Sequence, residues 1–232
     1  MVMLGTYVPD QLTVVTFDEA AEALRAGLRA ETGKAPPEDV QALALAKTAL
    51  EVFRFKSMHL WNFGNIKQGE QDPGMYTCFA CGEELSTGSY WFEPDGRIKH
   101  NGVWSQPHVF DPPNDGGHPQ TRFRAYANRF DGAYEYVSFL ARGTRYRPAW
   151  QGLLSGDPHQ FVHALKMAGY FTAQEAPYLA AVTSLWSEFR RRLRGIPVIE
   201  QEVDDGLPTW AELRAQVINR QFDIDNVIGR AA

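Results

Sequence analysis

The chain has 232 residues, of which 44% are hydrophobic and 22% are charged, and its formal net charge is −5. This composition lies in the ordinary range of globular proteins, and the length suffices for one large domain with small additions. Lys and Arg are not clustered, which excludes the basic surface that nucleic-acid binding requires. No apolar run approaches the roughly 20 residues of a membrane span, and the first residues lack the basic and apolar regions of a secretory signal.

The N-terminal quarter is predicted to be mainly helical. Residues 1–16 contain several β-branched residues and a proline, which favours an extended arm. Ala and Leu then recur at helical spacing over 18–30, and a stretch rich in Gly and Pro ends that helix. A second helix is expected from about Pro37, whose ring suits a first helical turn. This helix continues to Glu51, which lies beside its apolar stripe on the face that it shares with Lys47.

Residues 61–121 show no helical period. Gly, Pro, Asn and Asp recur every few residues between short aromatic or β-branched runs, which predicts a β-rich lobe with long loops. Within this lobe, Asp95 followed by Gly96 is typical of a hairpin turn. The segment from Tyr76 to Leu85 is predicted to be a strand that runs into a turn.

Helical patterns return in the C-terminal half of the chain. They cover four segments, 131–142, 148–154, 157–168 and about 177–193. Asp157 followed by Pro158 is a strong signal for the start of a helix. Residues 195–232 are expected to form an appendage, with an extended piece at 196–199 and a helix near 208–220. The predicted fold class is α+β, mostly α, with a helical domain over 1–194 and an inserted β-rich lobe.

Glu51 has the surroundings expected of a general acid. An acid that protonates a sugar oxygen must keep its proton near neutral pH, so it needs partly apolar neighbours. Leu50 precedes Glu51, Val52 and Phe53 follow it, and the C-terminal end of a helix also disfavours a negative charge. An exposed glutamate at a helix end would have the same local sequence, so this pattern by itself assigns no role.

Several short motifs extend the pattern around Glu51. Residues 44–51 read Ala-Leu-Ala-Lys-Thr-Ala-Leu-Glu, and Asn-Phe-Gly-Asn-Ile-Lys follows at 62–67. Phe-Arg-Ala-Tyr stands at 123–126, Phe-Asp-Gly-Ala-Tyr at 130–134 and Ala-Gly-Tyr-Phe-Thr at 168–172. In this order, over about residues 40–190, the motifs resemble the glucosaminidase family of peptidoglycan hydrolases. That family is glycoside hydrolase family 73, which has flagellar, autolysin and phage-lysin relatives.

The resemblance implies a lysozyme-like fold in which the β-lobe and the helices form a substrate cleft. Two departures affect the details. Residues 52–56, Val-Phe-Arg-Phe-Lys, stand where the family has Gly-Trp-Gly or a similar sequence, so sugar contacts there can differ. The β-lobe from 68 to 120 is also longer than in compact members of the family.

The resemblance makes Glu51 the general acid and places a second carboxylate in the β-lobe. Its best counterpart there is Glu83, chosen over Glu84. The other acids of the lobe that remain possible are Glu70, Asp72, Glu93, Asp95 and Asp111. A second carboxylate far from the first would favour inversion of the anomeric carbon, because a water must fit between them. Assistance by the N-acetyl group of the substrate is the alternative, and it needs no protein nucleophile.

Four polar residues are expected to contact or orient the glycan by the same resemblance. They are Asn62, Asn65, Tyr126 and Tyr134. Each tyrosine could equally be a half-buried core residue.

Cys78 and Cys81 are the only cysteines, spaced as in many zinc sites. A structural zinc needs about four ligands and a second cysteine pair is absent, so a metal would have to recruit His100, His108 or His118. We expect free thiols or a local disulfide, and no metal or cofactor.

The sequence therefore predicts a hydrolase that cuts the β-1,4 bond between N-acetylglucosamine and N-acetylmuramic acid. A lytic transglycosylase of the same superfamily and a non-catalytic wall-binding or virion module are the alternatives. The expected partner is the peptidoglycan glycan strand. We expect the protein to reach it in the periplasm or outside the cell, as a phage lysin, as part of a virion or after delivery by a secretion apparatus. The C-terminal appendage could bind a further protein.

Overall fold

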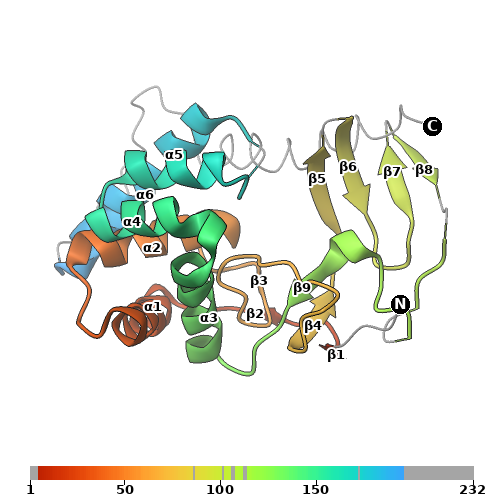
Figure 1. Cartoon of the computed structure of the whole chain (residues 1–232), viewed down its shortest axis with the longest axis horizontal. Coiled ribbons are helices and arrows are strands. Elements are labelled where there is room, and N and C mark those ends of the chain that lie inside the picture. Colours follow the sequence, from red (N-terminus) through yellow and green to blue (C-terminus); the bar gives the residue numbers. More distant parts are fainter. Residues whose placement is uncertain are drawn as a thin grey trace. The chain divides into compact units, whose positions relative to one another are not determined.

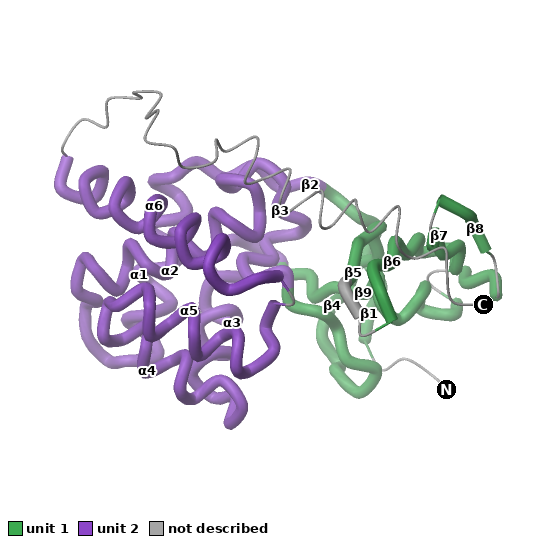
Figure 2. Tube along the Cα trace, turned by 90° about the horizontal axis from the view of Figure 1, so that it is seen from above, with its two compact units in different colours: residues 1–11, 66–126, 208–232 green, residues 12–65, 127–207 purple. Residues whose placement is uncertain are grey.

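The computed structural model describes residues 5–85, 87–100, 102–105, 108–111, 114–171 and 173–195. These residues form two compact units. One comprises 5–11 and 66–126, and the other comprises 12–65 and 127–195 (Figure 2). The predicted structure of 196–232 lies outside the described residues, so the boundary of the appendage stays a prediction.

The second unit is helical and contains a short two-stranded sheet (Figure 1). Its elements are β2 (Leu12–Thr13), α1 (Phe17–Thr32), α2 (Glu38–Glu51), β3 (Met58–His59), α3 (Arg129–Arg142), the 3-10 turn η2 (Thr144–Tyr146), α4 (Arg147–Ser155), α5 (Pro158–Met167) and α6 (Glu175–Leu193). Helix α1 packs against α3, α2 against α6, and α4 against α5. No helix in the described part of the chain is long and apolar enough to cross a membrane.

Local sequence signals explain where these helices begin. The side chain of Thr16 accepts a hydrogen bond from the backbone of Glu19, whose carboxylate accepts one from Thr16 in return, and this capping box starts α1. Asp157 accepts from the backbone N–H of His159 at 2.8 Å and so caps α5 as predicted. All the helices predicted up to residue 193 are confirmed, with ends shifted by a few residues.

Helix α2 differs from its sequence pattern. An apolar stripe predicts one buried face, but every residue from Val40 to Leu50 is buried, including Lys47 and Thr48. The reason is that α2 contacts α1, α4 and α6 and is therefore enclosed by other helices. Such a helix is buried all round, so periodicity cannot define its exposed side.

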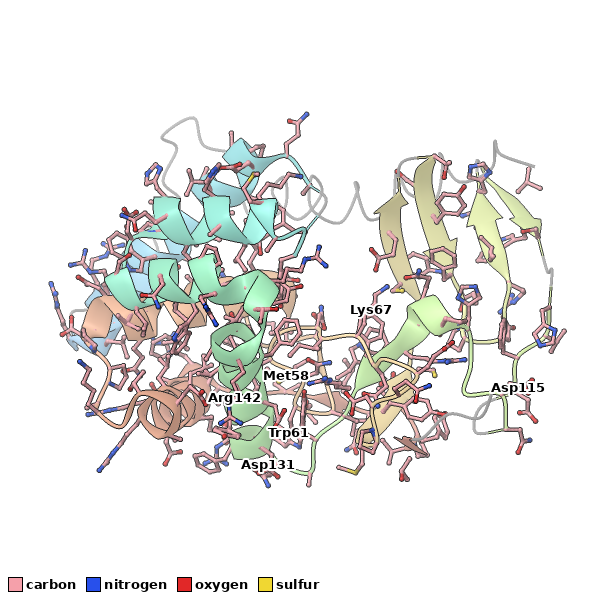
Figure 3. All side chains as sticks on the ribbon, in the orientation of Figure 1. Met58, Trp61, Lys67, Asp115, Asp131 and Arg142 are labelled. Atoms are coloured by element: carbon pink, nitrogen blue, oxygen red, sulfur yellow. The ribbon has the colours of Figure 1, made fainter. Side chains whose placement is uncertain are left out.

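The loop after α2 approaches α3 at a glycine. A Cβ atom on Gly132 would lie 1.9 Å from the backbone oxygen of Trp61, so only glycine fits at this point of α3. Figure 3 labels Trp61 and also Asp131, the neighbour of Gly132. This close approach helps to place the loop that follows Glu51.

The first unit is built from strands. β1 (Thr6–Tyr7) pairs in parallel with β4 (Met75–Cys78), and β9 (Arg122–Arg124) pairs antiparallel to the other side of β4. A four-stranded antiparallel sheet follows, with the order β5 (Cys81–Leu85), β6 (Gly88–Phe92), β7 (Ile98–His100) and β8 (Val103–Ser105). The 3-10 turn η1 (Pro119–Thr121) precedes β9.

The structure confirms the hairpin and corrects the strand prediction. β6 and β7 are joined through Asp95 and Gly96, and Gly96 has a φ of 96° that favours glycine. The segment predicted to be one strand running into a turn is instead two strands, β4 and β5, in different sheets. Glu83 consequently lies within β5. The α+β, mostly α fold class is confirmed.

Candidate active site

Glu51 is the last residue of α2, and its side chain keeps 20% of its surface exposed. One carboxylate oxygen, Oε1, accepts a hydrogen bond of 2.7 Å from the hydroxyl of Tyr178 in α6. The Nζ atom of Lys47 lies 3.4 Å from the same oxygen. The backbone oxygen of Glu51 accepts from the side-chain amide of Asn65 at 3.1 Å. Glu51 is therefore fixed by three elements and still reaches solvent.

Lys47 stands one helical turn before Glu51 and has no exposed surface. Its Nζ lies 3.7 Å from the ring centre of Tyr170 and 5.3 Å from that of Tyr136, which are cation–π distances. Burial lowers the pKa of Lys47 to about 8, although the carboxylate of Glu51 acts to raise it. The ammonium is thus held in a closed pocket of aromatic rings with one carboxylate beside it.

The tyrosines around this pair are kept neutral. Burial, and next the negative charge of Glu51, raise the pKa of Tyr136 and raise that of Tyr178 well above its usual value. Tyr178 therefore keeps its proton at neutral pH and remains a hydrogen-bond donor to Glu51. The hydroxyl of Tyr170 donates to the backbone oxygen of Gly64 at 2.6 Å and ties the chain after α5 to the loop after α2.

The backbone after Glu51 is strained. Phe53, Arg54 and Phe55 have φ values of 45°, 49° and 68°, in the left-handed region that favours glycine. Leu60, Trp61 and Asn65 also have positive φ. Each such residue costs on the order of 1 kcal/mol or more, and such strain gathers at functional sites. Arg54 donates to both carboxylate oxygens of Glu188 in α6, at 2.8 and 2.6 Å, which holds the turn in place.

The conformation of this turn concerns residues 52–56, where the chain departs from the glycine-containing motif of the family that it resembles. The family resemblance predicts glycine-containing residues directly after the acid, and glycine adopts positive φ at no steric cost. Here non-glycine residues take that conformation, and packing compensates for the strain: Phe55 is 3% exposed and stacks on Phe189 with ring centres 6.2 Å apart.

The two asparagines predicted to bind glycan lie in the helical unit. Asn65 has a direct place in the site, because its amide holds the backbone of Glu51 and its buried Oδ1 has no hydrogen-bond partner among the described residues. Asn62 has no exposed surface. That burial suits a structural role in the loop better than contact with a sugar.

The two predicted tyrosines belong to different units. The hydroxyl of Tyr134 accepts from Arg142 at 2.6 Å, and Arg142 also pairs with Glu31 at 3.0 Å; Figure 3 labels Arg142. Residues two apart on a helix point about 200° from each other, so Tyr136, not Tyr134, is the residue of α3 that reaches Lys47. Tyr126 is half-buried in the strand-rich unit, directly before the chain enters α3.

Glu83, the predicted second carboxylate, lies in the strand-rich unit. It forms an ion pair with Lys67, whose ammonium also donates to the side chain of Gln120 at 2.8 Å; Figure 3 labels Lys67. The side chain of Glu83 is 27% exposed. Glu51 and Glu83 thus belong to different units, and the role of Glu83 stays a prediction.

Most of the alternative acids have defined local partners. Asp72 pairs with Arg124 at 2.7 Å, and Glu93 accepts from the indole of Trp91 at 2.8 Å. The remaining contacts are those of Glu70 with Arg122, Asp95 with Arg97, and Asp111 with Asn114.

The two cysteines are free thiols and buried. The Sγ atom of Cys78 lies 3.3 Å from the backbone oxygen of Gly116, and that of Cys81 lies 3.1 Å from that of Gln120. Burial raises the pKa of Cys78 to about 11 and that of Cys81 to about 12. Across the described ranges, no group of three His, Cys, Asp or Glu residues could hold a metal ion.

Lys47, Tyr136, Tyr170 and Tyr178 were not predicted as site residues. The spacing of Lys47 and Glu51, one turn apart on a helix, is the only one of these relationships that the sequence contains. The tyrosines come from α3, from the segment after α5 and from α6, so no local pattern connects them.

Comparison with known proteins relates this chain to hydrolases of the bacterial wall by fold. No protein-family model matches it, and no curated protein matches its sequence. A mutant peptidoglycan hydrolase from Sphingomonas sp. A1 matches with a TM-score of 0.52 and 20% identity, over 76% of this chain and 97% of that one. A glycoside hydrolase domain of FlgJ from Salmonella typhimurium matches with a TM-score of 0.43 and 18% identity, over 74% of this chain and 95% of that one. The first match shows a shared fold, and at that level the resemblance predicted from the motifs is confirmed.

Proposed function

We propose that the protein is a peptidoglycan hydrolase in which Glu51 is the general acid. The observation that carries the proposal is the setting of this carboxylate: partly exposed, oriented by Tyr178 and Lys47, and followed by a strained turn. Sequence reasoning selected Glu51 from its place at the end of a helix and from the flanking motifs. A fold shared with a peptidoglycan hydrolase supports the proposed activity.

The proposed substrate is the β-1,4 bond between N-acetylglucosamine and N-acetylmuramic acid. In the reaction, Glu51 transfers its proton to the glycosidic oxygen as the bond from that oxygen to the anomeric carbon breaks. Water then adds to the anomeric carbon. Either Glu83 acts as the base toward this water, or the N-acetyl group of the sugar assists and Glu83 has no chemical role. The site of action is accordingly the bacterial cell wall.

Digestion of purified peptidoglycan tests the assignment of Glu51. Wild type is expected to release soluble fragments with new reducing ends, identified by mass spectrometry, and Glu51→Gln is expected to lose this activity by at least about a hundredfold. Glu22→Gln is the matched control, because Glu22 is an exposed glutamate of the same unit that pairs only with Arg129 among the described residues. Intact peptidoglycan after treatment with wild type would refute the function. Unchanged digestion by Glu51→Gln would refute the residue assignment.

The same products separate the alternatives. A lytic transglycosylase leaves 1,6-anhydro ends in place of reducing ends, and a wall-binding module releases no fragments while it sediments with the peptidoglycan. Glu83→Gln tests the second carboxylate, with Asp115→Asn as a control, because Asp115 is an exposed acid of the same unit that is not a candidate for this role. Loss of activity in Glu83→Gln alone supports the base mechanism, and full activity of Glu83→Gln excludes Glu83 as the base.

A further inference from the structure

Lys47 is the feature of the site that folding requirements do not explain. Its side chain is completely buried, and Glu51 is its ion-pair partner among the described residues. A buried ion pair is rarely better for stability than apolar side chains of the same size, because both charges lose their hydration. The Nζ atom is also 3.4 Å from the carboxylate, longer than a good charge-assisted hydrogen bond. The ammonium therefore costs the fold free energy.

Both donors act on the same oxygen of Glu51. Tyr178 and Lys47 contact Oε1, and no hydrogen bond or ion pair of Oε2 is found in the part of the chain that the structure describes. A protonated carboxyl group has one oxygen that accepts hydrogen bonds and one that carries the proton. Since Oε1 already accepts, the proton of the acid form belongs on Oε2, which is the oxygen that could donate to a substrate.

We propose that Lys47 is a positioning residue for the general acid, which anchors Oε1 of Glu51 and stabilises the negative charge that forms when the proton leaves Oε2. This inference rests on the proposed function. The O–H bond at Oε2 breaks as the glycosidic oxygen gains the proton, and Glu51 is left as a carboxylate while Lys47 remains an ammonium. Because the ammonium is already in place, it stabilises the partly negative Glu51 of the transition state more than it stabilises the neutral acid of the ground state.

Lys47 is the cation that faces Glu51 in this part of the structure. Besides Glu51, the titratable groups around the pair are phenols: Tyr136 of α3 and Tyr170 after α5 face Lys47, and Tyr178 of α6 faces Glu51. Of these, Tyr136 and Tyr178 have raised pKa values and stay neutral. Lys47 is therefore the cation that sets the field at Glu51.

The test is the kinetics of peptidoglycan digestion by Lys47→Met at about pH 6, where Lys47 of wild type is an ammonium. The kcat is expected to fall about tenfold while KM stays unchanged, because the lost charge acts on the transition state and not on the binding of substrate. Lys47→Gln should show the same fall in kcat, since it also lacks the charge but differs in shape and polarity.

Controls separate this mechanism from a structural role. The exposed Lys34 provides the matched variant Lys34→Met, which should keep the kcat and KM of wild type. A raised KM with unchanged kcat in both Lys47 variants would overturn the proposal, because the effect would then lie in substrate binding and not in the transition state. Wild-type kcat and KM in both variants would overturn it as well. The proposed function fails by a different result, inactivity of wild type or full activity of Glu51→Gln.

Discussion

Replacing Lys47 by methionine should make the protein more stable at neutral pH. The pKa of Lys47 is lowered from 10.5 to about 8, mainly by burial. One pKa unit corresponds to about 1.4 kcal/mol, so the fold disfavours the ammonium form by about 3 kcal/mol relative to the neutral amine. Methionine has a similar length and no charge. Because Glu51 keeps 20% of its side chain exposed, the carboxylate that is left behind can still be hydrated, and we expect Lys47→Met to raise the free energy of unfolding at pH 7 by up to about 3 kcal/mol.

The effect should depend on pH in a defined direction. Below about pH 8, Lys47 is protonated in the folded and the unfolded chain, so wild type carries the whole penalty. Between about pH 8 and 10.5 the folded chain has released a proton that the unfolded chain still binds, so the free energy of unfolding of wild type rises with pH. The advantage of Lys47→Met over wild type should therefore shrink across this range.

Chemical denaturation at pH 7 and at pH 9.5 measures both effects. The difference between the variant and wild type removes contributions that the two proteins share, and the exposed Lys34→Met should change stability by less than about 0.5 kcal/mol. A variant less stable than wild type at pH 7, or an advantage that is the same at both pH values, would refute the account of Lys47 as a costly buried charge.

Three further predictions concern Tyr178, the cap of α5 and the two cysteines. Tyr178→Phe removes the hydrogen bond to Glu51, and we expect kcat of peptidoglycan digestion to fall about tenfold with the fold retained; an unchanged kcat would show that the hydroxyl is dispensable. Asp157→Ala removes the cap of α5 and should lower the free energy of unfolding by about 1 kcal/mol in urea denaturation, whereas no change would exclude a stabilising cap. Cys78 and Cys81, with raised pKa values, should resist alkylation by iodoacetamide at pH 7.5 until the protein is unfolded, as followed by mass spectrometry. Rapid labelling of the native protein would contradict the burial of these thiols.

Local features of the structure were predictable from the sequence, and for the same reason in each case. The cap at Asp157 and the turn at Gly96 depend on interactions within a few residues, which the order of amino acids determines directly. The long helical segments followed from the spacing of Ala and Leu. The break between β4 and β5 was not predicted, because it depends on the pairing of these two neighbouring strands in two different sheets.

The residues of the candidate site were also predictable only in part. Glu51 could be selected from its position at a helix end and from the motifs around it, and its spacing from Lys47 was visible. The sequence does not show that Tyr136 is the residue of α3 that reaches Lys47, because this depends on which face of α3 points toward the lysine. That Glu51 and Glu83 belong to different units likewise depends on tertiary structure, and the roles of Tyr134 and Glu83 remain predictions.

The sequence by itself determined the order of the helices, the mostly helical fold and the position of Glu51 at the end of α2. Tertiary structure alone decided what surrounds Glu51. Packing of α2 inside the helical unit removes Lys47 from water, and it brings three tyrosines, widely spaced in the chain, to the lysine and the carboxylate. The physical reason is that hydration and charge depend on what lies nearby in space, so neither the cost of the ammonium nor its effect on Glu51 exists until the helices have assembled.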